Sequence, residues 1–398
     1  MKVNTDPNVI DAILTRSVKE VIPSRESLRE VLTSGKRMRI YIGTDATGAS
    51  LHLGHATNYL ILERFRQLGH EIIFLIGDFT SRIGDPTDKG DSARKQLTRD
   101  EVVRHTKTWI EQVRPIIDFD NSENPVRVMY NHDWLSKLTF EDIIGLASHF
   151  TVQHMLERDM FEKRLAEYKP LYLHELFYPL MQGYDSVAMD VDMELCGSDQ
   201  KFNALAGRTL LRKLKNKEKF VYITTLLENP KTGEKMMSKS LGTGVYLDYD
   251  AQKMYGAIMA QPDENIRQLF TDCTNVAVDD IEEMHQTYAN PRDLKMKLAF
   301  EITRMYHGEE GAERGERYFV ETFQQKHIPE NILEVHPDYL EQLVRAGVVG
   351  SKGEFRRLLE SGSVRNAETG EKLVVVPERV DEPMVIKIGK QRFVRLLP

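Results

Sequence analysis

The first half of the chain alternates short apolar runs with longer stretches in which apolar residues recur at helical spacing. The runs are bounded by Gly, Asp and Asn, which is typical of buried strands, whereas no Gly or Pro interrupts the stretch at 55–68. We expect strands at 39–45, 70–79 and 126–132, and helices at 55–68 and 100–117. This β-α-β-α-β order predicts an α/β fold, a Rossmann-like parallel sheet covered by helices.

The pattern changes beyond Gly242. From 246 to 321 it is helical with little strand signal, and prolines punctuate the segment that follows. Near the C-terminus two short helices precede apolar runs at 372–377, 384–389 and 392–397, which we expect to be strands. The predicted division is therefore a Rossmann-like catalytic domain at 1–242, a helical domain at 243–325, a linker at 326–337 and a small α+β domain at 338–398.

Composition is that of a globular protein. The chain has 398 residues, of which 41% are hydrophobic and 29% charged, enough to build a sizeable core. No apolar run reaches membrane-spanning length, and the N-terminal segment lacks the pattern of a secretory signal. Cys196 and Cys273 show neither metal-ligand spacing nor a disulfide framework. We expect a cytoplasmic protein with no membrane partner.

Charge is unevenly distributed. The net charge is −7, yet residues 351–398 carry ten basic and seven acidic side chains, and residues 201–220 carry seven basic side chains and one acidic. A locally basic surface on an acidic protein can bind a polyanion such as RNA, and it can equally be an ordinary solvated face.

Two loops rich in Gly, Asp and Thr follow predicted strands. They read "YIGTDATG" (41–48) and "GDFTSRIGDP" (77–86). In parallel sheets ligands bind at the carboxyl ends of the strands, so these loops predict a ligand site. "LHLGH" follows the first loop and spaces His52 and His55 three residues apart around Gly54. Three interpretations are open: metal ligands, paired core histidines, or a phosphate site at a helix N-terminus, where free N–H groups and the helix dipole favour an anion.

A second polar segment bears on that choice. "GEKMMSKSLG" (233–242) places Lys235, Ser238, Lys239 and Ser240 in a loop, and lysine and serine are suited to phosphate. Together and in this order, "HLGH" and "MSKS" resemble the two signatures of the class I aminoacyl-tRNA synthetases.

More of the chain resembles one group of that class, the bacterial tyrosyl-tRNA synthetases. The resemblance includes "YIGTDATGASLHLGH", "LIGDFTSRIGDP", "YPLMQGYDS" and "CGSDQKFN", and the tail resembles a small ribosomal-protein-type RNA-binding module. It spans about Tyr41 to Leu397. It implies a homodimeric tyrosine–tRNA ligase that forms tyrosyl-adenylate from L-tyrosine and ATP, and then charges tRNA(Tyr).

The amino-acid site has a physical basis besides the resemblance. Tyr178, Gln182 and Asp185 are spaced i, i+4 and i+7, so a helix places them on one face, where inward polar groups need partners. By resemblance, the α-amino end meets Tyr178, Gln182 and Asp85, the phenol hydroxyl meets Asp185 and Tyr41, the carboxylate meets Gln200, and Thr80 belongs to the same site.

The resemblance also implies the ATP site and the groups that assist the chemistry. The expected ATP contacts are Gly43, Asp45, Gly54, Gly197, Asp199, Ser238 and Lys239. Thr47, His52, His55 and Lys239 are the expected catalytic residues, with Lys89 and Arg94 as further phosphate contacts. The substrate carboxylate is already ionised at pH 7, so the enzyme supplies positioning and charge stabilisation rather than a base. Mg²⁺ is expected to arrive with ATP, and no protein metal site is expected.

The sequence departs from the usual motifs of the resembled family at two positions, and its tail carries the residues expected to contact RNA. Met236 stands where the usual loop motif has its first lysine, and Ile42 follows Tyr41 where relatives commonly have cysteine. In the tail, the expected RNA contacts are Arg356, Arg357, Arg365, Lys387, Lys390 and Arg392.

Three rival functions remain at this stage. One is a non-catalytic RNA-binding protein, such as a splicing helper, on a synthetase fold; the presence of His52, His55 and Lys239 disfavours it. A cofactor adenylyltransferase would not require the helical domain or the basic tail. A synthetase for tryptophan is disfavoured by Tyr41 with Asp185, because indole offers a single N–H donor.

Overall fold

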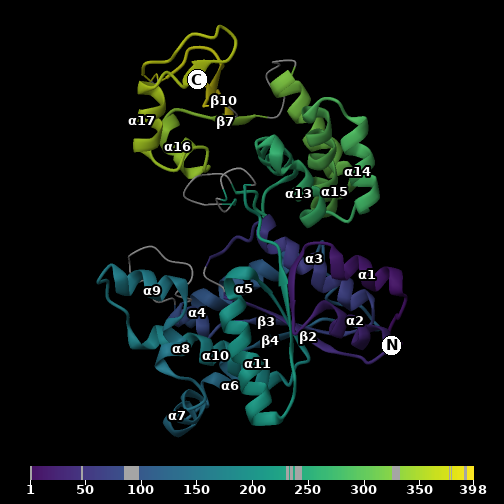
Figure 1. The fold of residues 1–398 in the computed structure, drawn as a ribbon. Coiled ribbons are helices and arrows are strands. Elements are labelled where there is room, and N and C mark those ends of the chain that lie inside the picture. Colours follow the sequence, from purple (N-terminus) through teal and green to yellow (C-terminus); the bar gives the residue numbers. More distant parts are fainter. Residues whose placement is uncertain are drawn as a thin grey trace. The chain divides into compact units, whose positions relative to one another are not determined.

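The chain folds into two compact units, Met1–Glu313 and Arg314–Pro398. The computed structural model (Figure 1) describes residues 2–45, 48–84, 98–229, 233, 236–237, 244–324, 332–375, 377, 379–389 and 392–398. The two units are described in turn, and the four-part domain division remains a prediction.

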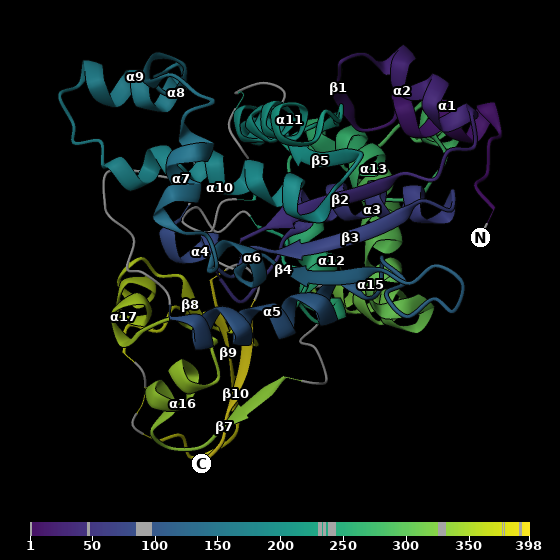
Figure 2. The same cartoon turned by 90° about the horizontal axis from the view of Figure 1, so that it is seen from below.

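A six-stranded sheet organises the first unit. Its strands are β1 (Val18–Ile22), β2 (Arg39–Thr44), β3 (Glu71–Ile76), β4 (Arg127–Tyr130), β5 (Met193–Gly197) and β6 (Phe220–Thr224), in the order β1-β6-β5-β2-β3-β4. Figure 2 shows β5, β2, β3 and β4 side by side. Every neighbouring pair is parallel except β1 with β6. The predicted parallel sheet is confirmed, and the antiparallel edge strand β1 is an addition from a segment for which we predicted no strand.

Helices pack on both faces of this sheet because side chains alternate along each strand. On one face Tyr41 and Leu75 join the core formed with α10 (Leu173–Met189) and α11 (Lys201–Lys215). On the other face Phe74 packs against Tyr59 of α3 (Leu53–Gln67), with 5.3 Å between ring centroids. The strand ends between these layers are where the candidate site lies.

The remaining helices complete the first unit, and the last of them continues into the second. They are α1 (Pro7–Thr15), α2 (Arg25–Thr33), α4 (Thr80–Ile83), α5 (Arg99–Val113), α6 (His132–Leu135), α7 (Phe140–Ala147), α8 (Val152–Leu156), α9 (Asp159–Ala166), η2 (Ser198–Gln200), α12 (Ala251–Met259), η3 (Asp263–Asn265), α13 (Ile266–Cys273), α14 (Val278–Thr287) and α15 (Pro291–Phe319). α15 is kinked at Gly308, whose φ is +70°. Among the described helices, none combines the length and apolar character that a membrane span requires.

The second unit is built on a four-stranded sheet. Its elements are a π-helical turn at Val320–Gln324, β7 (Leu333–Val335), α16 (Tyr339–Arg345), α17 (Lys352–Glu360), β8 (Val364–Asn366), β9 (Met384–Ile388) and β10 (Arg392–Leu396), with strand order β7-β10-β9-β8. Leu343 and Phe355 of the helices pack against Ile386 and Val394 of the sheet.

One expected strand of the tail is wrong. The apolar run at 372–377 forms no strand in its described part, where Val374 and Val375 are 83% and 72% exposed. β-branched residues favour strands through packing, and here the packing partners are missing. The third strand is instead β8, which pairs with β9.

Candidate active site

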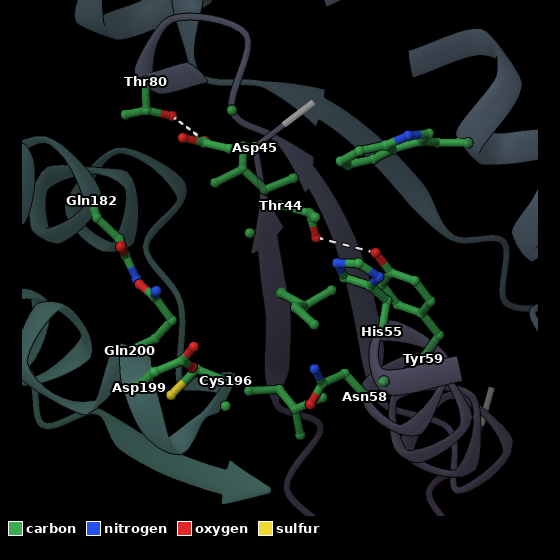
Figure 3. Close-up of a pocket in the computed structure, with 18 of the residues that line it drawn as sticks. Thr44, Asp45, His55, Asn58, Tyr59, Thr80, Gln182, Cys196, Asp199 and Gln200 are labelled. Atoms are coloured by element: carbon green, nitrogen blue, oxygen red, sulfur yellow. Dashed lines mark hydrogen bonds between the residues drawn. The ribbon is translucent and has the colours of Figure 1, made fainter. Parts of the chain in front are cut away.

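A cavity of about 810 Å³ opens at the carboxyl ends of the parallel strands (Figure 3). The residues that line it come from the ends of β2, β3 and β5 and from the first turn of α3, with α10 forming a wall. The structure brings together in this cavity the following predicted site residues: Gly43, Asp45, His52, Gly54, His55, Thr80, Tyr178, Gln182, Asp185, Gly197, Asp199 and Gln200.

Several predicted residues lie outside the described residues. They are Thr47, Asp85, Lys89, Arg94, Lys235, Ser238 and Lys239. Their predicted roles are neither supported nor opposed by the structure.

The histidine pair marks the start of α3. His52 is the N-cap residue, and its backbone N–H donates to Nδ1 of His55 at 3.2 Å. A neutral His55 therefore carries its proton on Nε2, which makes that atom a hydrogen-bond donor. The two rings lie 3.8 Å apart between centroids. A Cβ at position 54 would lie 3.1 Å from the His52 ring, so Gly54 leaves room for it.

Helix α5 holds the loop that leads into this histidine turn. Trp109 donates from Nε1 to the carbonyl of Gly48 at 2.7 Å. Gln112 accepts from the N–H of Leu51 and donates to the carbonyl of Ala49, both at 2.8 Å. The backbone before the helix is thus held at three points by side chains that no sequence motif identified.

A continuous chain of hydrogen bonds forms the opposite wall. Tyr178 donates to one carboxylate oxygen of Asp45 at 2.9 Å, and Thr80 donates to the other at 2.6 Å. Asn131 donates to Thr80 at 3.0 Å and to Asp185 at 3.2 Å. Asp45, predicted as an ATP contact, is therefore joined to residues predicted for the amino-acid site.

Gly77 is required by this arrangement. A Cβ there would lie 2.0 Å from Oδ1 of Asp45 and 2.4 Å from the Thr80 hydroxyl. Figure 3 shows the Thr80–Asp45 hydrogen bond that occupies this space. Any side chain at position 77 would break the chain where it passes from β2 to the loop after β3.

Asp185 is 3% exposed at the end of this chain. Trp134 donates to one of its oxygens at 2.7 Å and Asn131 to the other. Burial raises the pKa of this carboxyl well above its usual range, and the nearby Asp45 and Glu194 carboxylates add to the rise, whereas the two N–H donors lower the pKa. Asp185 also lines the cavity, together with Asp45 and Thr80.

Tyr41 is not among the residues that line the cavity, and its predicted role beside the phenol hydroxyl remains a prediction. It is fully buried on the α10 and α11 side of β2, and its hydroxyl lies 2.9 Å from Oγ of Ser186. Burial raises the pKa of its phenol well above 10. The alternation along β2 directs this side chain into the helix-covered core, which the motif alone does not reveal.

The remaining wall follows β5. Gly197, Asp199 and Gln200 line the cavity from the strand end and η2. Figure 3 shows the side chains of Gln182 and Gln200 pointing toward one another. Asn58, which the sequence reasoning missed, lines the cavity one turn after the histidines and accepts from Thr224 at 2.6 Å.

Within the described ranges, no cluster of three or more His, Cys, Asp or Glu side chains is arranged to hold a metal ion. The cavity combines donors at a helix start with buried acceptors, a combination suited to an anionic group at one end and a cationic or hydroxyl-bearing group at the other.

The predicted RNA contacts of the tail separate into two groups. Arg356 and Arg357 on α17 and Arg365 on β8 are exposed. Arg365 is the cross-strand partner of Lys387, and Lys387 of Phe393, so these three side chains share one face of the sheet.

Arg392 is different from the other tail residues. Its guanidinium donates to the carbonyl of Val348 and pairs with Glu354 at 3.3 Å, and its side chain is 40% exposed. Its predicted contact with RNA remains a prediction. Lys390 lies outside the described residues.

A parallel sheet that carries paired histidines at a helix start beside a small polar pocket defines a nucleotide-dependent enzyme of the Rossmann-like class. The family model described as tRNA synthetases class I (W and Y) matches residues 33–324. The chain belongs to this family, and within it to the tyrosyl-tRNA synthetases, as the sequence resemblance predicted.

Individual relatives agree with this assignment. The chain is 41% identical to the tyrosine–tRNA ligase of Carboxydothermus hydrogenoformans over 97% of both chains, and 39% identical to that of Thermotoga maritima over 96% of both. A solved structure of a C-terminally truncated mitochondrial tyrosyl-tRNA synthetase from Coccidioides posadasii matches with a TM-score of 0.63 and 25% identity, covering 78% of this chain and 91% of that one. The tyrosyl-tRNA synthetase of Archaeoglobus fulgidus, solved with L-tyrosine, shares the fold at a TM-score of 0.60 and 20% identity over 78% of this chain and all of that one.

Proposed function

We propose that this chain is a tyrosine–tRNA ligase that activates L-tyrosine with ATP and transfers it to the 3′ end of tRNA(Tyr). One observation carries the proposal: a single cavity holds both the histidine turn of α3 and the polar face of α10 formed by Tyr178, Gln182 and Asp185. The first suits a triphosphate and the second an amino acid.

The amino acid lies along α10 in this proposal. Asp185 accepts the phenol hydroxyl, while Tyr178 and Gln182 receive the α-ammonium group. Gln200, across the cavity, meets the carboxylate. A pocket built to accept a hydroxyl rejects phenylalanine, because phenylalanine displaces water from the carboxylate and supplies no hydrogen-bond donor in its place. Tyr41 keeps the role beside the phenol hydroxyl that the resemblance implies.

The nucleotide lies between α3 and the end of β5. The tyrosine carboxylate attacks the α-phosphorus of ATP, the bond to the bridging oxygen breaks, and pyrophosphate leaves. His52 donates toward the phosphates as charge moves to the leaving group, while His55, with Asp199 and Gly197, holds the ribose side. Thr47, Ser238 and Lys239 keep the phosphate roles that the resemblance implies, with Lys89 and Arg94 beside them. Mg²⁺ enters with ATP as part of the substrate.

In the second step a ribose hydroxyl of tRNA attacks the tyrosyl carbonyl and AMP leaves. The C-terminal sheet supports a role in holding that tRNA. Arg365 and Lys387 present two positive charges beside the ring of Phe393, with the Lys387 ammonium 5.2 Å from the ring centroid. Basic side chains neutralise phosphates, and the half-buried ring of Phe393 can stack on an unpaired base.

We also propose that two copies of the chain associate. Large exposed hydrophobic side chains are concentrated between residues 140 and 173: Phe140, Ile144, Val152, Leu165, Tyr168, Tyr172 and Leu173. Figures 1 and 2 show the helices that carry most of them, α7, α8 and α9, gathered near one another. Such a patch marks a protein interface, and a homodimer is the usual state of the family.

Sedimentation velocity tests the homodimer. Replacing Phe140 and Ile144 by serine should convert a dimer into a folded monomer. An unchanged sedimentation coefficient for a folded variant would place the interface elsewhere.

Pyrophosphate exchange against each of the twenty amino acids tests the activity itself. Tyrosine alone should support exchange of labelled pyrophosphate into ATP. Exchange that prefers tryptophan or phenylalanine, or none with any amino acid, would overturn the proposed function.

A further inference from the structure

A lysine and a glutamate form an ion pair in the interior beside the amino-acid pocket. The side chain of Lys219 is 0% exposed and that of Glu194 2% exposed. The Lys219 ammonium donates to the Glu194 carboxylate and, at 2.9 Å, to Oγ of Ser186. Removing two charged groups from water costs free energy, and a protein with apolar residues of similar volume in their place is often equally stable. A contribution to stability therefore does not account for the pair.

Glu194 connects this pair to the substrate cavity. It lines the cavity from β5, and its Oε1 accepts a hydrogen bond from Nε2 of Gln182 at 3.0 Å. A carboxylate that is paired with an ammonium group is only an acceptor. The Gln182 amide must therefore turn its NH₂ group toward Glu194, and its carbonyl oxygen remains for the cavity.

The direction of that amide decides what the cavity can bind there. An ammonium group only donates hydrogen bonds, so it needs the carbonyl oxygen of Gln182 and is repelled by the NH₂ group. We propose that the buried Lys219–Glu194 pair is a positioning device that locks the Gln182 amide with its oxygen toward the α-ammonium group of the substrate. This inference rests on the proposed function and adds two residues that do the positioning.

The surrounding fold is built to hold the ammonium of Lys219. A Cβ at Gly207 on α11 would lie 2.6 Å from the Lys219 nitrogen and 2.7 Å from the Ser186 hydroxyl, so only glycine leaves this space. Ser186 in turn contacts the hydroxyl of Tyr41, and the ammonium lies 5.9 Å from the Tyr41 ring centroid. The pair therefore has fixed partners on three sides.

Two ligands that differ only in the amino group separate positioning from general support. Tyrosinol carries the ammonium group, and 3-(4-hydroxyphenyl)propan-1-ol lacks it. Their dissociation constants are measured by calorimetry on the full-length protein and on the Glu194→Gln/Lys219→Met double variant. The double variant leaves no buried charge unpaired, and its amide at 194 can accept or donate, so Gln182 is no longer held in one orientation.

We expect tyrosinol to bind about tenfold more weakly to the double variant, the cost of one misdirected hydrogen bond to a charged group, while the amine-free alcohol changes by less than about twofold. Lys217→Met is the matched control: Lys217 precedes Lys219 by two residues, and its ammonium contacts Asp190 and Asp192, which do not line the cavity. Its binding of both ligands should match the parent.

Three results would overturn the inference. Equal weakening of the two ligands would mean that the pair merely supports the wall. Unchanged tyrosinol binding by the folded double variant would mean that Gln182 needs no lock, and equal weakening by Lys217→Met would remove the specificity of the effect. Failure of the proposed function is distinct, because the parent protein would then support no tyrosine-dependent pyrophosphate exchange.

Discussion

The cavity and the C-terminal sheet both carry charged side chains, but these side chains differ in burial and in the partners they have. In the cavity, the carboxylates of Asp45, Asp185 and Glu194 each accept hydrogen bonds from at least two donors and are held in fixed positions. On the C-terminal sheet, Arg365 is exposed and lies beside Lys387, another positive charge. Buried charged groups with fixed hydrogen-bond partners select a small molecule by its geometry. Positive side chains at the surface attract a polyanion and require little of its geometry.

The largest effect is expected at the histidine end of the cavity. His52→Ala removes a preorganised donor that acts on the phosphates, so kcat for pyrophosphate exchange should fall by about 10²–10³-fold while tyrosine binding is unchanged. Lys239→Ala should show the same split. His336→Ala, an exposed position of the tail, is the control. A His52→Ala enzyme with the parent kcat would show that the histidine turn does not act on the phosphates.

The free energy of unfolding should depend on pH through a buried histidine of the first unit, His70. Burial, with the charge of Arg37, lowers the pKa of His70 from 6.5 to about 4. As the pH falls below 6.5, His70 of the unfolded chain therefore takes up a proton, while His70 of the folded protein does not. The free energy of unfolding therefore decreases between pH 6.5 and about pH 4. Between pH 7 and pH 5 the loss should be about 2 kcal/mol.

Urea unfolding at pH 7, 6 and 5 measures this loss. His70→Gln should remove most of the difference between the pH values, whatever its effect on stability at pH 7. An equally steep decline in the variant would mean that other groups are responsible.

Specificity is expected to change at Asp185. Asp185→Ala removes an acceptor for the phenol hydroxyl, which costs tyrosine about 1.5–3 kcal/mol and costs phenylalanine nothing comparable. The ratio of kcat/KM for tyrosine over phenylalanine should fall by at least about tenfold. Asp280→Ala, an exposed carboxylate on α14, should leave the ratio unchanged. If a folded Asp185→Ala enzyme discriminates as well as the parent, Asp185 does not recognise the hydroxyl.

The smallest effect is expected on the C-terminal sheet. The double variant Arg365→Gln/Lys387→Gln should raise KM for tRNA about threefold and reduce the slope of log KM against log salt by about 1–2, with pyrophosphate exchange unchanged. Arg395→Gln is the control on the same face, because Arg395 already pairs with Glu334 at 2.7 Å. An unchanged salt slope would remove the sheet from the tRNA-binding surface.

The elements and motifs that depend on the local pattern of residues could be predicted from the sequence. The parallel strands, the helix after "HLGH" and the shared face of Tyr178, Gln182 and Asp185 all follow from periodicity, and the structure places these three residues in one cavity. The strand expected at 372–377 was wrong because an apolar run does not form a strand without a partner to pair and pack with.

Contacts between segments that are distant in the sequence could not be predicted from the local pattern of residues. Asn131 and Trp134 reach Asp185 from more than 50 residues away, and Lys219 meets Glu194 from the position just before the neighbouring strand β6. Tyr41 was assigned to the cavity because its motif carries it there by resemblance. The face of β2 on which it lies depends on helices that pack only in the folded chain.

The hydrogen-bond chain from Tyr178 through Asp45, Thr80 and Asn131 to Asp185 has a consequence for the history and redesign of this pocket. Each interior member is hydrogen-bonded to both neighbours, so a substitution at one of them removes a hydrogen bond from two others. Such positions are strongly epistatic. Adapting the pocket to an unnatural amino acid therefore requires concerted replacement of adjacent members, and libraries that vary one of these codons at a time will return mostly inactive enzymes.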